Sequence, residues 1–142
     1  MNKELNRKLM EYAEEILQSN VCPLYKEAGV IHESYNGQVS ALGVSTLMIG
    51  LKATLAVYYQ DEPLKDDKNK VFKSKSYRRC LLEVIVKMLN LQNPETTYEN
   101  AEKFVRKVME KANTPQQEEQ WKSDVVNCSV ALKQVIRTYK LG

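Results

Sequence analysis

The sequence predicts an all-α protein, a single-domain helical bundle of about five principal helices over residues 1–142. Three observations lead to this prediction. Apolar residues recur at helical spacing along most of the chain, and no segment shows strand-like alternation bounded by turns. Only five Gly and four Pro occur, so little of the chain has to be irregular. A length of 142 residues suits one domain with one hydrophobic core.

The first predicted helix covers residues 4–18, where apolar side chains fall on one face. It ends before Pro23, because a proline disfavours helical geometry at the residue that precedes it. We expect a loop or a short helix at 20–32. A long second helix is predicted from about Ser34 to Tyr59.

The charged stretch around Pro63 predicts a loop, and a third helix follows at 76–90. Thr96 and Glu99 have the spacing of a capping box, which predicts a fourth helix at about 97–112. A last helix is predicted from Thr114, as its N-cap, to about Leu141. Pro115 in the first turn supports that start.

The stretch SALGVSTLMIGLKATLAVYY, residues 40–59, is apolar enough to raise the alternative of a membrane span. Three observations favour the central helix of a bundle instead. Lys52 lies near the middle of the stretch, its upstream flank has no aromatic belt and no clear basic cluster adjoins it, and the neighbouring helices are amphipathic. On a helical grid, one face of this stretch carries mostly small residues. Its candidate packing or subunit-interface positions are Gly43, Leu47, Gly50 and Thr54.

Positive charge is concentrated at residues 64–79, where seven bases face two acids, a local balance of +5 in a chain of net charge +3. Phe72 and Tyr77 are interleaved with these bases, a pattern that suits RNA. A second basic set falls in one stripe of the predicted last helix. The candidate RNA-binding residues are Lys70, Lys73, Lys75, Arg78, Arg79, Lys133, Arg137 and Lys140. The alternatives are a solvated loop and the ordinary polar face of a helix.

The sequence shows no pattern typical of an enzyme, a cofactor site or a metal site. His32 is the single histidine and has no cysteine at ligand spacing. Three scattered cysteines and an N-terminus without an apolar signal core lead us to expect a cytoplasmic protein that is not exported. Gly43 and Gly50 lack the strand–turn–helix context of a phosphate-binding loop.

Residues 34–60 resemble the signature helix of the small subunit of type III-B CRISPR effector complexes, the Cmr complexes. The matching positions are Tyr35, Leu42-Gly43, Ile49, Gly50-Leu51, Thr54-Leu55-Ala56 and Tyr58. The C-terminal ALKQVIRTYKL (131–141) is similar to the closing helix of that family. Unlike in some relatives, the residues before the Leu-Gly step (Asn36, Gly37, Gln38, Ser40) carry no charge.

The resemblance implies a small helical protein that is not a nuclease. Copies of it would stack beside the backbone subunits of a ribonucleoprotein and contact guide and target RNA through basic surface. The analogous small subunit of a sister type III complex remains an alternative. Another is a helical protein-interaction module with no nucleic-acid role, and a third is a membrane-anchored bundle.

Overall fold

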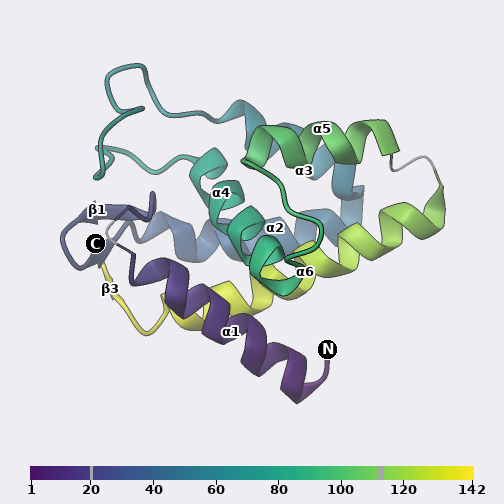
Figure 1. Cartoon of the computed structure of the whole chain (residues 1–142). Coiled ribbons are helices and arrows are strands. Elements are labelled where there is room, and N and C mark those ends of the chain that lie inside the picture. The colour runs from purple at the N-terminus through teal and green to yellow at the C-terminus, as the bar shows by residue number, and fades with distance from the viewer. Residues whose placement is uncertain (20, 112–113) are drawn as a thin grey trace.

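A computed structural model of the chain describes residues 1–19, 21–111 and 114–142. The protein is mostly helical, which confirms the predicted fold class, and the described residues form six helices rather than five (Figure 1). The helices are α1 (Lys3–Leu17), α2 (Ser34–Ile49), α3 (Leu51–Gln60), α4 (Arg78–Gln92), α5 (Ala101–Lys111) and α6 (Pro115–Ile136).

Helix α6 is the longest and packs against α1, α2 and α4, so the other helices are arranged around it (Figure 1). Its start agrees with the prediction, because the Thr114 side chain accepts a hydrogen bond from the Gln117 N–H at 3.3 Å and Pro115 is the first helical residue. Helix α1 begins in the same way, with the Asn2 side chain accepting from the Leu5 N–H at 2.7 Å.

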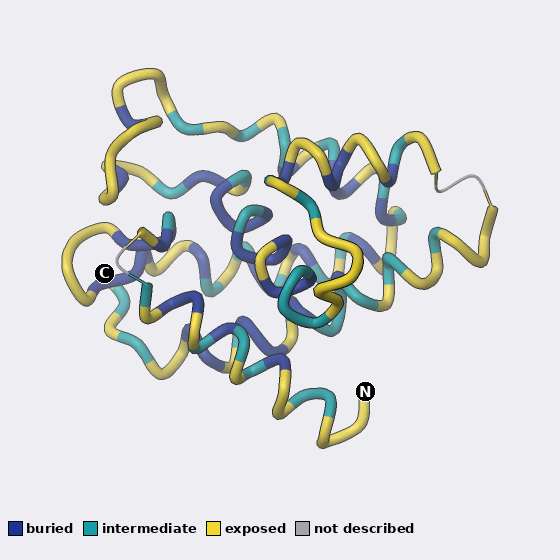
Figure 2. The backbone as a smooth tube through the Cα atoms, in the orientation of Figure 1, coloured by how far each residue is buried: buried dark blue, intermediate teal, exposed yellow. Residues whose placement is uncertain are grey.

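Buried apolar side chains from all six helices form one hydrophobic cluster. Figure 2 shows the buried stretches of the chain facing inward along the helices, with exposed stretches in the loops and on the outer faces. Tyr35, Phe104 and Leu9 are among the largest side chains that are fully buried. The apolar periodicity read from the sequence therefore identifies the faces that this cluster buries.

Three short strands form a sheet that the sequence did not predict, so the expectation of no strands was wrong. They are β1 (Tyr25–Glu27), β2 (Val30–Ile31) and β3 (Lys140–Leu141). Strand β2 lies in the middle, antiparallel to β1 and parallel to β3. Two or three residues are too few to show an alternating pattern, and the pairing of β2 with β3 joins distant parts of the chain.

The predicted second helix is broken at Gly50, which has φ +94° and separates α2 from α3. After the break α3 folds back along α2. The Tyr58 hydroxyl donates to the Gln38 carbonyl oxygen at 2.7 Å, and the Ser45 and Thr54 hydroxyl oxygens lie 2.8 Å apart. Residues 38 and 58 would lie about 30 Å apart on a continuous helix.

The two halves of the apolar stretch at 40–59 therefore form a helical hairpin. None of the helices in the described ranges combines the length and the apolar character that crossing a membrane requires.

Two predicted helix boundaries also need correction. Helix α5 begins at Ala101, not near Thr96, because the Asn100 side chain accepts from the Lys103 N–H at 2.9 Å and replaces the predicted capping box. Its predicted last residue, 112, lies outside the described residues. Helix α6 ends at Ile136 rather than near Leu141, because the following residues turn and enter β3.

Candidate nucleic-acid interface

The basic segment at 64–79 consists of a loop and the first two residues of α4, and two buried rings anchor it. His32 Nε2 lies 2.8 Å from the carbonyl oxygen of Lys73. The Tyr35 hydroxyl accepts from the Tyr77 N–H at 2.9 Å and donates to the Tyr77 carbonyl oxygen at 3.2 Å. Burial raises the pKa of Tyr35, so its hydroxyl stays protonated and able to donate. The helical core thus fixes the path of this loop.

Asp67 is the polar centre of the loop, with only 1% of the residue exposed. Its Oδ2 accepts hydrogen bonds from the Ser74 hydroxyl at 2.6 Å and the Tyr77 hydroxyl at 3.2 Å. The Lys70 ammonium lies 3.7 Å from Oδ1. These contacts lower the pKa of Asp67, with the hydrogen bond from Ser74 the largest cause, and they outweigh the opposite effect of burial.

Lys73, a candidate RNA-binding residue, is buried. Its ammonium donates to the Lys70 carbonyl oxygen, and its backbone N–H donates to the Tyr25 carbonyl oxygen at 3.3 Å. This side chain therefore serves the fold of the loop. Only 7% of the residue is exposed in this conformation.

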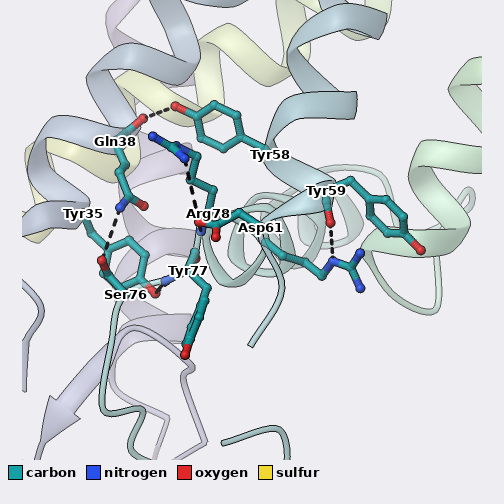
Figure 3. A network of polar contacts seen from close by, with 9 residues as sticks. Tyr35, Gln38, Tyr58, Tyr59, Asp61, Ser76, Tyr77 and Arg78 are labelled. Atoms are coloured by element: carbon teal, nitrogen blue, oxygen red, sulfur yellow. Dashed lines mark hydrogen bonds and ion pairs between the residues drawn. The ribbon is translucent and has the colours of Figure 1, made fainter. Parts of the chain in front are cut away.

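Arg78 and Arg79 also contact neighbouring groups; Figure 3 shows Arg78 between Asp61 and Tyr58. The Arg79 guanidinium lies 3.8 Å from the centre of the Tyr59 ring, and its Nε donates to the Tyr59 carbonyl oxygen at 2.6 Å. It also pairs with Glu62 at 2.7 Å. The Arg78 guanidinium lies 3.9 Å from Asp61 and 5.8 Å from the centre of the Tyr58 ring.

The acids that pair with these arginines lie just before the segment counted from the sequence. Adding Asp61 and Glu62 to the count lowers the local balance from +5 to +3. Of the candidates in this segment, Lys70, Lys75 and Arg78 are exposed. Lys70 and Arg78 each form an ion pair, and Lys75 forms none with the described residues. The segment therefore offers less available charge than its composition indicates.

The C-terminal candidates do not form the predicted stripe. Lys133 lies on α6, where its ammonium donates to the Ser40 hydroxyl of α2. Arg137 is exposed at the end of α6, and Lys140 is exposed on strand β3. Because the helix ends at Ile136, the expected i, i+4, i+7 alignment of these three residues is wrong.

The predicted face of small residues is divided between two helices. Gly43 does mark a close approach, since a Cβ there would lie 3.0 Å from the Ser129 hydroxyl oxygen of α6. Gly50 instead supplies the left-handed turn of the hairpin, and Thr54 is buried against Ser45. Leu47 is 61% exposed, so these four positions do not form one surface.

An exposed apolar ridge runs along the C-terminal part of α2, where a bundle helix would ordinarily be polar. We call it the α2 ridge; it consists of Val44, Leu47, Met48 and Ile49, which are 55%, 61%, 78% and 58% exposed. A shallow groove beside it lies between α2 and α6 and includes Gly43, Ser129 and Val130. Contiguous exposed apolar side chains of this kind are typical of a protein-interaction surface.

Helix α5 carries a basic face that the sequence reasoning missed. Its exposed bases are Lys103, Arg106, Lys107 and Lys111, against the acids Glu102 and Glu110, which gives a balance of +2. Lys103, Arg106 and Lys107 form no ion pair with any residue in the described ranges. The spacing i, i+3, i+4 in KFVRK was the signal that could have identified this face.

The thiols do not form a reactive site. Cys22, Cys80 and Cys128 are all buried, and burial raises the pKa of each, that of Cys22 to about 11. A thiol with a raised pKa is a poor nucleophile near neutral pH. In the described residues no three His, Cys, Asp or Glu side chains are grouped closely enough to hold a metal ion.

Comparisons with known proteins identify no relative: no protein family matches the chain, and no curated protein or solved structure shows significant similarity to it.

Proposed function

We propose that the protein is a non-catalytic small subunit of a type III-B CRISPR (Cmr) ribonucleoprotein effector complex, which acts in antiviral defence in the cytoplasm. In this role it stacks with other copies and with the backbone subunits. Its basic surface contacts the phosphates of guide and target RNA, without base specificity.

The observation that carries the proposal is the place of the resembling residues in the fold. Tyr35 anchors the loop before α4, Gly43 lies against α6, and Gly50 makes the turn of the α2–α3 hairpin. Leu51, Leu55 and Tyr58 are buried in the same hairpin. Several residues of the stretch that resembles the signature helix therefore contribute to the central packing of this chain, which supports the proposal.

Two surface features support the partners that the proposal requires. The α2 ridge exposes four large apolar side chains, which suits docking to another protein subunit. The outer face of α5 exposes lysine and arginine without ion-pair partners in the described ranges, which suits a phosphate backbone. Lys75, Arg137 and Lys140 are the other exposed candidates that form no ion pair in the described ranges.

A protein-interaction module without a nucleic-acid role is the second candidate function, and the α2 ridge is the observation that favours it. This candidate requires the ridge and makes no use of the α5 bases. The small subunit of a sister type III complex would use both features, and the identity of the co-purifying subunits separates it from the Cmr assignment.

The proposal is tested by adding the purified chain to a guide-RNA-loaded Cmr complex that lacks its small subunit. We expect the chain to co-elute with the complex in size-exclusion chromatography and to protect target RNA. Changing Leu47 and Met48 to Asp should prevent incorporation, and circular dichroism should show an unchanged helix content. Failure of the unaltered chain both to join the complex and to bind RNA at low salt would overturn the proposal.

A further inference from the structure

A cavity of about 290 Å³ lies between the C-terminal end of α4, the segment that connects α4 to α5, and the first half of α6. Its lining residues are Leu89, Gln92, Asn93, Thr96, Tyr98, Gln120, Trp121 and Asp124. This volume is close to the lower limit of about 300 Å³ for small-molecule sites. None of the residues that line it is a lysine or an arginine.

The walls of the cavity are held in place by contacts within the protein. The Asn90 side chain binds both backbone groups of Tyr98, donating to its carbonyl oxygen and accepting from its N–H at 2.8 Å each. The Tyr98 ring packs edge-on against Phe104, with ring centres 5.0 Å apart. The Trp121 indole N–H donates to the Tyr98 hydroxyl at 3.3 Å. The cavity is therefore preorganised, which lowers the entropic cost of binding.

The first feature that favours a cation is a carboxylate without a positive partner. Asp124 is half-buried. Its carboxylate accepts one hydrogen bond, from the Gln120 amide at 3.0 Å, and forms no ion pair in the described ranges. Burial raises the pKa of this carboxyl, and no nearby lysine or arginine offsets the effect. A bound cation would compensate the negative charge of the Asp124 carboxylate.

The second feature is the end of helix α4. Leu89 and Gln92 lie in its last turn, and Asn93 is its C-cap. A helix C-terminus carries partial negative charge from its free carbonyl groups, and cations usually compensate it. The last turn of α4 contains no basic residue.

The third feature is the pair of aromatic side chains, since Trp and Tyr rings attract organic cations. We propose that this cavity binds an alkylammonium or guanidinium group, which pairs with Asp124, lies beside Trp121 and Tyr98, and donates to polar groups at the end of α4. Two sources share this chemistry, a free polyamine and an arginine or lysine side chain of a partner protein.

Trp121 is the single tryptophan of the chain, so its fluorescence reports on the cavity directly. The full chain is titrated with N-acetyl-arginine amide, with spermidine, and with N-acetyl-citrulline amide as the neutral counterpart of the first, all at one ionic strength. We expect a saturable change in Trp121 fluorescence with at least one of the two cations and no change with N-acetyl-citrulline amide. Tighter binding of arginine indicates a partner side chain, whereas tighter binding of spermidine indicates a polyamine.

Asp124→Asn should weaken cation binding at least tenfold, and Glu119→Gln should leave it unchanged. Glu119 is the matched control, because it is an acid of the same helix that does not line the cavity. Calorimetry repeats each titration without relying on fluorescence. The proposal is overturned if neither method detects a cation, if citrulline binds as tightly as arginine, or if a folded Asp124→Asn binds normally. The citrulline comparison uses the unaltered protein, so it decides the question even if that variant does not fold. RNA is absent throughout, so the result is independent of the proposed function.

Discussion

The segment at residues 61–79 and helix α5 are both basic, but they differ in how many of their bases are paired within the protein. In the first, Asp61 and Glu62 form ion pairs with Arg78 and Arg79. The Lys73 ammonium donates to a backbone carbonyl oxygen, and Tyr35 connects the loop to the core by hydrogen bonds. In α5 the bases lie on the outer face of an amphipathic helix whose other face is buried. The count of basic residues therefore does not measure the charge available to a phosphate backbone.

The largest effect that we expect in this comparison comes from Tyr35→Phe, which removes one hydroxyl. The buried Tyr77 N–H would lose its partner, and the Tyr77 carbonyl oxygen would keep only the hydrogen bond from the Cys80 N–H, which costs about 1–3 kcal/mol in free energy of unfolding. Urea denaturation followed by circular dichroism measures the loss. Lys107→Ala in α5 is the comparison and should change stability by less than about 0.5 kcal/mol. Equal effects of the two changes would show that the loop is not held more firmly than the face of α5.

A smaller effect is expected for Arg79→Lys, which keeps the charge and removes the planar guanidinium. The contact with the Tyr59 ring and the hydrogen bond to its carbonyl oxygen should weaken, at a cost of about 1 kcal/mol. Arg106→Lys on α5 should have no measurable effect on the denaturation midpoint. If Arg79→Lys also left the denaturation midpoint unchanged, the contacts of the Arg79 guanidinium would not stabilise the fold.

The smallest effect concerns pH and Asp67. Its pKa is lowered in the folded protein, so its stabilising contribution is present above the carboxyl pKa of the unfolded chain, about 4. This contribution disappears as the pH falls through the folded pKa. The difference in urea midpoint between the unaltered chain and Asp67→Asn should thus be constant from about pH 7 to 5 and shrink below about pH 4. A difference that grows on acidification would contradict the assignment.

The helical periodicity was enough to predict the fold, because each helix buries an apolar stripe in one core. The break at Gly50 was harder to predict, since glycine is compatible both with a helix interior and with φ +94°. One signal was present in the sequence. The buried positions 35, 39, 42 and 46 keep helical phase, whereas Leu51, Leu55 and Tyr58 begin a new phase after the glycine.

The candidate interface was less predictable, because ion pairing depends on where the loop lies. Arg79 forms an ion pair with Glu62, which lies outside the basic segment at 64–79. The predicted stripe of Lys133, Arg137 and Lys140 is wrong because Lys140 and Leu141 form strand β3 and pair with β2. This pairing joins chain segments more than a hundred residues apart, which local spacing does not reveal. The basic face of α5 could be predicted from local spacing alone, because Lys103, Arg106 and Lys107 fall at i, i+3 and i+4 of one helix.

We predict that exposed, unpaired bases rather than total charge determine how strongly this chain binds RNA. The most direct test of this prediction is the salt dependence of RNA binding by two variants with the same net charge. In one variant, Lys103, Arg106 and Lys107 of α5 become Gln. In the other, the ion-paired residues Lys68, Lys70 and Arg78 become Gln.

Each variant lowers the net charge from +3 to 0. The α5 variant should bind single-stranded RNA at least tenfold more weakly and lose about 2 from the slope of log K against log salt, as expected for three phosphate contacts. The paired-residue variant should stay close to the unaltered chain in both quantities. Equal losses in the two variants, or a greater loss in the paired-residue variant, would contradict the account.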